Sequence, residues 1–154
     1  MAKLYIVRGL PGSGKSKNAK QWVANDPQNR ARVNRDDLRA MMHQGYFGEY
    51  TEKQVTEVQY AMIDTLLDMG KLVICDDTNL QSRTVRELIE IAMDHEADWE
   101  IVDKTDMPLD ICLIGNNSQH RIDTGAVVPE GVIVSMYERY IKDQGYPLPV
   151  PEVD

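Results

Sequence analysis

Cysteine and long hydrophobic runs are both scarce in this sequence. Its 154 residues include two cysteines, Cys75 and Cys112, which stand in apolar surroundings without a CxxC or histidine-rich spacing. This pattern argues against a zinc site or a redox pair, and we expect both thiols to be reduced and buried. No apolar run approaches the roughly 18 residues of a membrane-spanning helix, and residues 1–3 lead directly into a predicted strand. These absences predict a cytoplasmic protein without a membrane partner.

Positive charge is scarce as well. The 17 lysines and arginines are outnumbered by 25 aspartates and glutamates, which gives a formal net charge of −8. This balance excludes a general basic coat for nucleic acid, although it leaves room for a local basic groove. We find no repeat, linker or second domain, and the length predicts a single domain over residues 1–154. The proline-rich residues 145–154 predict a tail that is extended or loose.

The first motif in the sequence lies at residues 4–16, LYIVRGLPGSGKS. The apolar residues 4–7 predict a strand, and residues 9–16 satisfy the phosphate-binding pattern G-x-x-x-x-G-K-[ST], the P-loop. Its glycines let successive N–H groups turn inward, and the following helix points its positive end at the same place. Lys15 adds a cation for the β- and γ-phosphates, and the Ser16 hydroxyl is placed to hold Mg²⁺. The residues predicted to bind ATP or another nucleoside triphosphate are Gly9, Pro11, Gly12, Ser13, Gly14, Lys15 and Ser16.

Strand-like runs alternate with helical patterns along the rest of the chain. Further strands are predicted at residues 31–33, 72–75 and 99–102, and helices at 17–24, 38–43, 51–69, 83–95, after Pro108 and after Pro129, with an irregular polar segment at 116–125. This alternation predicts an α/β fold with a parallel sheet of about four to five strands and helices on both faces. Ligands of such sheets bind beyond the carboxyl ends of the strands. The loops after the first three strands, the P-loop, 34–39 and 76–79, are therefore the functional candidates.

The segment between the second and third predicted helices carries two local signals. Thr51 with Gln54 predicts a capping box that starts the third helix. Residues 44–50 before it predict a loop with three aromatic side chains, Tyr46, Phe47 and Tyr50. These rings are compatible with stacking on a base of the acceptor, and equally with pinning the loop to the core. The sequence leaves both interpretations open.

The loop at 34–39, NRDDLR, supplies groups for phosphoryl transfer to a hydroxyl. That reaction needs a carboxylate near the attacking oxygen, which Asp36 or Asp37 provides. Arg39 follows Asp36 by three positions, so in a helical turn both face one side, and its guanidinium suits a phosphate already on the acceptor. The alternative makes one of the aspartates a helix N-cap and Arg39 a solvated side chain. Asp76 ends its strand as a Walker-B acid would, either holding the metal through water or capping the next turn.

In combination, these motifs resemble the kinase module of bacteriophage-type polynucleotide 5′-kinases. The resemblance rests on GLPGSGKS, on NRDDLR about twenty residues later and on DTNL at residues 77–80, and it extends to about Tyr140. It implies that Asp36 is the general base and that Arg39 contacts the phosphate next to the 5′-hydroxyl. It also implies that Asp77, Thr78 and Asn79 line the acceptor side.

The same resemblance implies a lid arginine over the donor phosphates, ahead of a Val-Pro pair. Arg121 lies before Val128-Pro129 and is the candidate, acting as an arginine finger supplied in cis. The resemblance also implies an Arg-Asn pair in the helix before the lid. The arginine of this pair is missing here, and the segment differs in length. His120 therefore remains an alternative at this position, as does a solvated loop role for Arg121.

The prediction is a polynucleotide 5′-hydroxyl kinase that uses ATP and Mg²⁺, held by Ser16 and Asp76, to phosphorylate the 5′-OH ends of DNA or RNA in end healing. Two-domain members of the family carry a phosphatase after the kinase, and no DxDxT loop occurs here, which predicts a kinase-only form. One alternative is a kinase of a nucleoside, sugar or antibiotic. Another is a nucleotide-dependent switch or ATPase, against which stands the absence of a guanine-reading N-K-x-D motif. The sequence leaves the oligomeric state open.

Overall fold

Four parallel strands form the central sheet, in the order β2-β3-β1-β4. The computed structural model describes residues 2–153, apart from the side chains of His120 and Thr124. The strands are β1 (Lys3–Arg8), β2 (Arg30–Val33), β3 (Leu72–Cys75) and β4 (Asp98–Asp103). They are the four predicted strands, each lengthened by a residue or two or unchanged, and the α/β prediction is confirmed.

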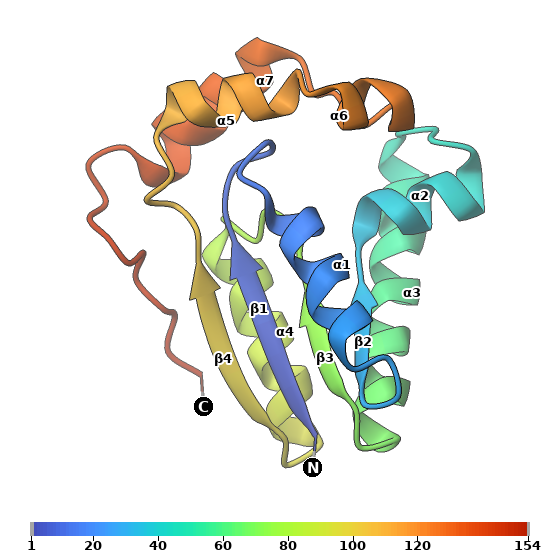
Figure 1. The fold of residues 1–154 in the computed structure, drawn as a ribbon. Coiled ribbons are helices and arrows are strands. Elements are labelled where there is room, and N and C mark those ends of the chain that lie inside the picture. The colour runs from blue at the N-terminus through green and yellow to red at the C-terminus, as the bar shows by residue number, and fades with distance from the viewer. Residues whose placement is uncertain (1, 154) are drawn as a thin grey trace.

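Helices cover both faces of the sheet and also its upper end. The helices are α1 (Lys15–Asn25), α2 (Arg35–His43), α3 (Glu49–Asp68), α4 (Ser82–Asp94), α5 (Leu109–Asn116), α6 (Gln119–Thr124) and α7 (Glu130–Met136), followed by a π-helical turn at Tyr137–Ile141. Helix α1 lies on one face, whereas α3 and α4 lie on the other (Figure 1). Helices α5, α6 and α7 arch over the carboxyl ends of the strands (Figure 1). No helix in the described part of the chain is long and apolar enough to cross a membrane.

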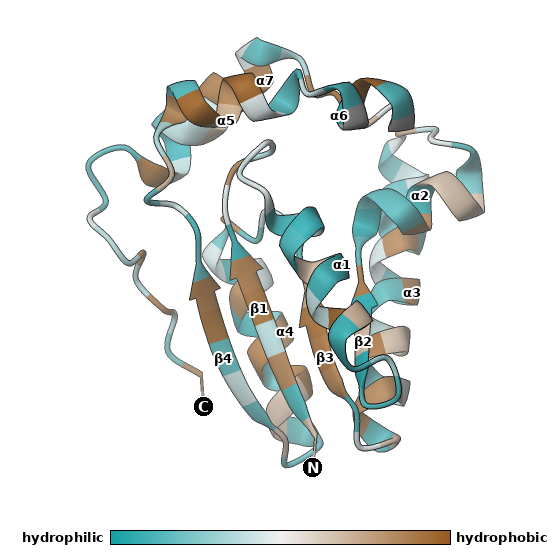
Figure 2. Ribbon diagram, in the orientation of Figure 1, coloured by the Kyte–Doolittle hydropathy of each residue, from teal (hydrophilic) through white to brown (hydrophobic). Residues whose placement is uncertain are grey.

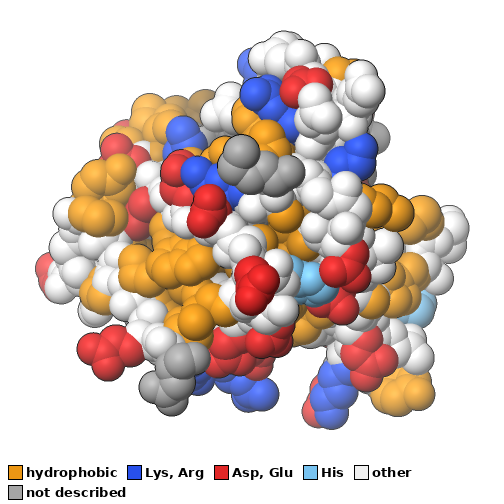
Figure 3. Space-filling view, turned by 90° about the horizontal axis from the view of Figure 1, so that it is seen from below, with side chains coloured by type: hydrophobic (Ala, Val, Ile, Leu, Met, Phe, Trp, Pro, Cys, Tyr) orange, Lys and Arg blue, Asp and Glu red, His pale blue; other side chains and the backbone are white. Residues whose placement is uncertain are grey.

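The alternation of side chains along β1 explains why both faces are covered. Leu4 and Ile6 are fully buried in the cluster that contains the inner faces of α3 and α4. Tyr5 and Val7 point the other way and pack with Ala19 of α1. Apolar residues therefore fill both sides of the central strands, which are largely brown in Figure 2, while much of α1 is teal. The end of the molecule seen from below in Figure 3 carries acidic and basic side chains interspersed with apolar ones.

Helix α3 begins two residues before the predicted start, at Glu49. Its N-cap is Gly48 rather than Thr51, which is the third helical residue and accepts a hydrogen bond from the Gly48 N–H at 3.1 Å. The buried face is Val55, Gln59, Ile63 and Leu67, whereas Val58, Met62 and Leu66 are partly buried at its edge. A polar residue at the centre of this face, Gln59, interrupts its apolar pattern.

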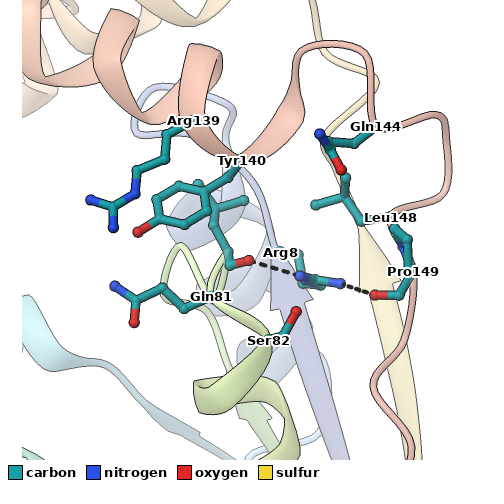
Figure 4. A pocket seen from close by; sticks show the side chains of 9 residues that line it. Arg8, Gln81, Ser82, Arg139, Tyr140, Gln144, Leu148 and Pro149 are labelled. Atoms are coloured by element: carbon teal, nitrogen blue, oxygen red, sulfur yellow. Dashed lines mark hydrogen bonds between the residues drawn. The ribbon is translucent and has the colours of Figure 1, made fainter.

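Of the two expectations for the proline-rich tail, extended or loose, the loose one is wrong, because residues 145–153 pack against the domain. Leu148 is 3% exposed, and its N–H donates to Asp103 Oδ2 at 2.7 Å. Arg8, at the end of β1, is 2% exposed and donates to the carbonyl oxygens of Pro149, Asn79 and Leu80. Figure 4 shows this arginine beside a cavity of about 360 Å³. Leu148 and the Pro149 carbonyl therefore anchor the tail to the ends of β4 and β1.

Candidate active site

The P-loop connects the buried strand β1 to the N-terminus of α1. Gly12 and Gly14 have φ angles of 84° and 87°, a left-handed backbone that favours glycine. The Lys15 side chain folds back, and its Nζ donates to the Leu10 carbonyl at 2.7 Å. Burial, together with the nearby charge of Arg121, lowers the pKa of Lys15 to about 8. A phosphate would offer this ammonium a better partner than the carbonyl.

Helix α2 begins with its cap on Asn34, which leaves both aspartates available for other contacts. The Asn34 side chain accepts from the Asp37 N–H at 3.0 Å, and the N-cap alternative for Asp36 and Asp37 is thereby removed. The Asp36 side chain is 64% exposed and accepts from Arg39 Nη1 at 2.7 Å. Asp37 pairs instead with Arg32 of β2. The two neighbouring carboxylates therefore stand in different environments.

Arg39 is not a solvated side chain, because it is held by a carboxylate from α3. Its Nε and Nη2 donate to the two oxygens of Glu52 at 2.7 and 2.6 Å. Only 13% of the Arg39 side chain is exposed, and the Glu52 and Asp36 hydrogen bonds raise its pKa. The same contact lowers the pKa of Glu52. Arg39 is therefore a fixed, fully charged group beside Asp36.

The carboxylate of Asp76 is buried at the end of β3 and is only partly satisfied. Its Oδ2 accepts from Arg32 Nε at 2.8 Å. Its Oδ1 is buried without a hydrogen-bond partner among the described residues. Such an oxygen suits a cation or a water bound to one. The described residues hold no group of three or more His, Cys, Asp or Glu side chains that could bind a metal by themselves, and Mg²⁺ in particular is commonly held by few protein ligands together with substrate phosphates.

The residues of the Asp77-Thr78-Asn79 element form hydrogen bonds with other residues of the protein. Asp77 accepts from the Arg35 N–H at 2.8 Å, and burial raises its pKa to about 6. Asn79 Nδ2 donates to the Val7 carbonyl at 2.7 Å, and the Thr78 carbonyl accepts from the Gly9 N–H. These bonds join β1, β3 and the start of α2. The element thus holds the P-loop and α2 in place, and its three residues are not among those that line the large cavity beside the P-loop.

A lid closes over the P-loop, and it contains helix α6 where an irregular segment was expected. Asn116, 1% exposed, donates to the Val128 carbonyl at 2.7 Å and accepts from the Val128 N–H at 2.9 Å. Helix α5 rests directly on the P-loop, because a Cβ on Gly115 would lie 2.2 Å from the Gly12 carbonyl oxygen. Arg121 lies in the segment closed by Asn116 and Val128. The side chain of His120 lies outside the described part of the structure.

These elements enclose one cavity of about 1240 Å³, between the P-loop, α1, α2 and the lid. Its charged lining residues are Lys15, Lys17, Lys20, Arg32, Arg39 and Arg121 on the positive side and Asp36 and Asp37 on the negative side. Cations therefore dominate here although the whole chain has a formal charge of −8. The cavity combines a P-loop, an exposed carboxylate and a fixed guanidinium. These are the kinds of group that phosphoryl transfer uses.

A family model described as an AAA domain matches residues 4–141. The chain belongs to this AAA domain family. The match runs from β1 to the π-helical turn, and within this family the chain has the α/β fold of a P-loop kinase. The prediction of a P-loop kinase-type module is thus confirmed.

Solved structures support the same classification. A chain of the Pnkp1/Rnl/Hen1 RNA repair complex matches with a TM-score of 0.79 and 28% identity, covering 97% of this chain and 48% of that chain. The AAA domain described here thus spans about half the length of that relative. The APS kinase CysC of Mycobacterium tuberculosis, bound to AMPPNP and APS, matches with a TM-score of 0.62 and 18% identity over 82% of this chain and 76% of that one. Kti12 of Chaetomium thermophilum, in complex with ADP-AlF3, matches with a TM-score of 0.65 and 18% identity over 96% and 88%.

Sequence reasoning missed three residues that shape the site. Glu52 is an ordinary first-turn acid of α3, and nothing in its neighbourhood signals a partner thirteen residues away. Arg32 lies within a short strand, where its reach to Asp76 depends on the sheet order. Asn116 falls in the segment that the sequence predicts to be polar and irregular. An arginine inside a strand that leads into a polar loop was the one available signal.

Proposed function

We propose that this domain is a polynucleotide 5′-hydroxyl kinase that transfers the γ-phosphate of ATP to the 5′-OH end of DNA or RNA. The observation that carries the proposal is the arrangement of Asp36, Arg39 and Glu52 at the edge of the P-loop cavity. An exposed carboxylate is there paired with a guanidinium that α3 holds in place. A hydroxyl that carries a phosphate nearby fits this pair, because one group accepts the proton and the other binds the phosphate.

In the proposed reaction Asp36 accepts the proton of the attacking 5′-hydroxyl, while Arg39 binds the phosphate on the 3′ side of the same nucleoside. Lys15 leaves the Leu10 carbonyl and binds the donor's β- and γ-phosphates, as P-loop lysines do. Arg121, carried by the lid, stabilises charge on the transferring phosphoryl. The Asp77-Thr78-Asn79 element keeps the P-loop and α2 in register.

The donor and the metal fit the residues on the P-loop side. Kti12 and the CysC kinase have been solved with ADP-AlF3 and AMPPNP, which supports ATP as the donor for this fold. Mg²⁺ would be held by the Ser16 hydroxyl and, through water, by the unsatisfied Oδ1 of Asp76. When bound, the ion neutralises charge on the donor phosphates.

The choice of a polynucleotide rests on the acceptor side of the cavity. The relative in the RNA repair complex supports an acceptor at nucleic-acid ends and a role in end repair. The likeness to an APS kinase concerns the fold, yet it keeps a phosphorylated small molecule as the second candidate. A small acceptor without any phosphate would leave Arg39 without a ligand.

The proposal is tested by incubating the protein with γ-labelled ATP, Mg²⁺ and a panel of acceptors. The panel contains 5′-hydroxyl DNA and RNA oligonucleotides, nucleoside 3′-monophosphates, nucleosides and sugars. We expect label on oligonucleotides and weaker labelling of nucleoside 3′-monophosphates. Label on nucleoside 3′-monophosphates, nucleosides or sugars but on no oligonucleotide would favour the small-molecule alternative, and ATP hydrolysis without any acceptor would favour a switch or ATPase.

A further inference from the structure

Three aromatic side chains stand exposed where the cavity wall continues onto the surface. Tyr46, Phe47 and Tyr50 lie in and just after the connection between α2 and α3, and they are 64%, 72% and 74% exposed. This exposure removes the interpretation that they pin the connection to the core. Gln44 and Gly45, which directly precede Tyr46, line the cavity itself. The three rings therefore continue the cavity wall onto the protein surface.

Phe47 is backed by the arginine of the proposed acceptor site. The Cζ of Arg39 lies 4.8 Å from the centroid of the Phe47 ring, a cation–π contact. Arg39 is in turn fixed by Glu52 and Asp36. One face of the ring is thus supported by an immobilised guanidinium, and the exposure of Phe47 leaves room for a planar ligand on the other face.

Tyr46 is backed by the main chain. A Cβ placed on Gly48 would lie 2.6 Å from a ring carbon of Tyr46, so the absence of a side chain at Gly48 lets the ring lie close to the backbone. Gly48 is also the N-cap of α3, which fixes its position. A ring that is held before the ligand arrives loses less conformational freedom on binding. Rigid backing of this kind favours a binding surface over a mobile loop.

We propose that Phe47, together with the exposed Tyr46 and Tyr50 close to it in the sequence, binds the second and third bases of a single-stranded acceptor by stacking. This inference rests on the proposed function, because it takes Arg39 as the ligand of the acceptor's first phosphate. The base that follows this phosphate along the strand then meets the ring that lies on Arg39. Stacking accepts any base, since each has a π-face, and it adds affinity without a basic surface. That suits a chain with a formal charge of −8.

The test measures the acceptor KM for two 5′-hydroxyl oligonucleotides of six nucleotides, one intact and one abasic at its second and third positions. In the wild-type protein we expect the abasic acceptor to have a KM about 5- to 100-fold higher than the intact one. In Phe47→Leu this ratio should fall to about 1 to 3, because the apolar side chain is kept but the ring is lost. Phe47→Trp should restore the wild-type ratio. Trp99→Leu, an aromatic substitution on β4, is the matched control and should keep it.

The ratio separates stacking from a structural role of the ring. Misfolding in Phe47→Leu would lower the apparent kcat for both acceptors, and a distorted Arg39 would raise both KM values alike, so neither changes the ratio; Tyr50→Leu provides a second measurement of it. A wild-type ratio near 1, or an unchanged high ratio in Phe47→Leu and Tyr50→Leu, would overturn the inference. If oligonucleotides are labelled but the KM ratio is near 1, only the stacking inference is contradicted. If the protein binds ATP but labels no oligonucleotide, the proposed function itself is contradicted.

Discussion

Arg39 donates two hydrogen bonds to Glu52, from Nε at 2.7 Å and from Nη2 at 2.6 Å. A bidentate guanidinium–carboxylate pair of this kind fixes direction as well as charge. The remaining nitrogen, Nη1, is thereby kept on Asp36. The distance between the proposed base and the proposed phosphate ligand is therefore set by a residue of α3 that contacts neither reactant.

Glu52→Gln should weaken acceptor binding and leave ATP binding unchanged. The amide can accept a hydrogen bond from Arg39 on one side only, and loss of a charge-assisted bond typically costs about 1.5 kcal/mol or more. We expect the acceptor KM to rise about tenfold at constant KM for ATP. Glu49→Gln, an exposed acid in the same helical turn, is the control. An equal rise in both KM values would mean that Glu52 supports the fold and not the acceptor site.

The lowered pKa of Lys15 predicts how ATP binding depends on pH. In the nucleotide-free protein its pKa is about 8, so the side chain is charged below pH 8 and loses its proton above it. ATP affinity should be level up to about pH 8 and then fall by up to about tenfold per pH unit, since binding must first recharge the lysine.

Calorimetry in two buffers of different ionisation enthalpy measures the corresponding proton. We expect proton uptake on ATP binding near pH 8 to 9 in the wild type. Lys15→Arg keeps its charge over this range and should show neither the uptake nor the fall. A wild-type affinity that stays constant to pH 10 would contradict the buried environment of Lys15.

The Asn116–Val128 clamp should govern turnover through the lid. Asn116→Leu removes two buried hydrogen bonds, at a cost of about 1–3 kcal/mol for the groups left unpaired. Because the lid carries Arg121, we expect kcat to fall at least about tenfold with little change in acceptor KM. Asn117→Ala, at the exposed neighbouring asparagine, is the control. Arg121→Ala should show the same pattern, and a loss confined to His120→Ala would move the finger role to that residue.

The sequence predicted the parts of the site that are local in the chain. The P-loop and the pairing of Asp36 with Arg39 follow from spacing within a few residues, because a turn or a single helical turn brings those groups together. Glu52 and Asn116 act across elements, where packing angles decide which side chains meet. The docked tail escaped prediction for the same reason, since the prolines do not indicate that the Pro149 carbonyl accepts a hydrogen bond from Arg8.

The salt dependence of nucleic-acid binding should be weak. In the proposed acceptor site Arg39 binds one phosphate, and each phosphate neutralised on a single strand contributes about −0.7 to the log–log slope. A footprint of one to three phosphates gives a slope of magnitude about 0.7–2, and Arg39→Ala should reduce it by roughly one unit. The slope is measured by titrating a labelled oligonucleotide at several salt concentrations. A slope typical of eight or more phosphates would indicate a long basic groove.

The central claim of the proposed function is that Asp36 accepts the proton of the attacking 5′-hydroxyl. The decisive measurement is single-turnover phosphoryl transfer from ATP to a 5′-hydroxyl oligonucleotide by Asp36→Asn, with ATP affinity measured on the same protein. We predict that transfer slows by about 10²–10⁴-fold while ATP affinity stays near that of the wild type. Asp37→Asn, which changes the neighbouring carboxylate paired with Arg32, should be much less damaging. Transfer that survives in Asp36→Asn and is lost in Asp37→Asn would contradict the account.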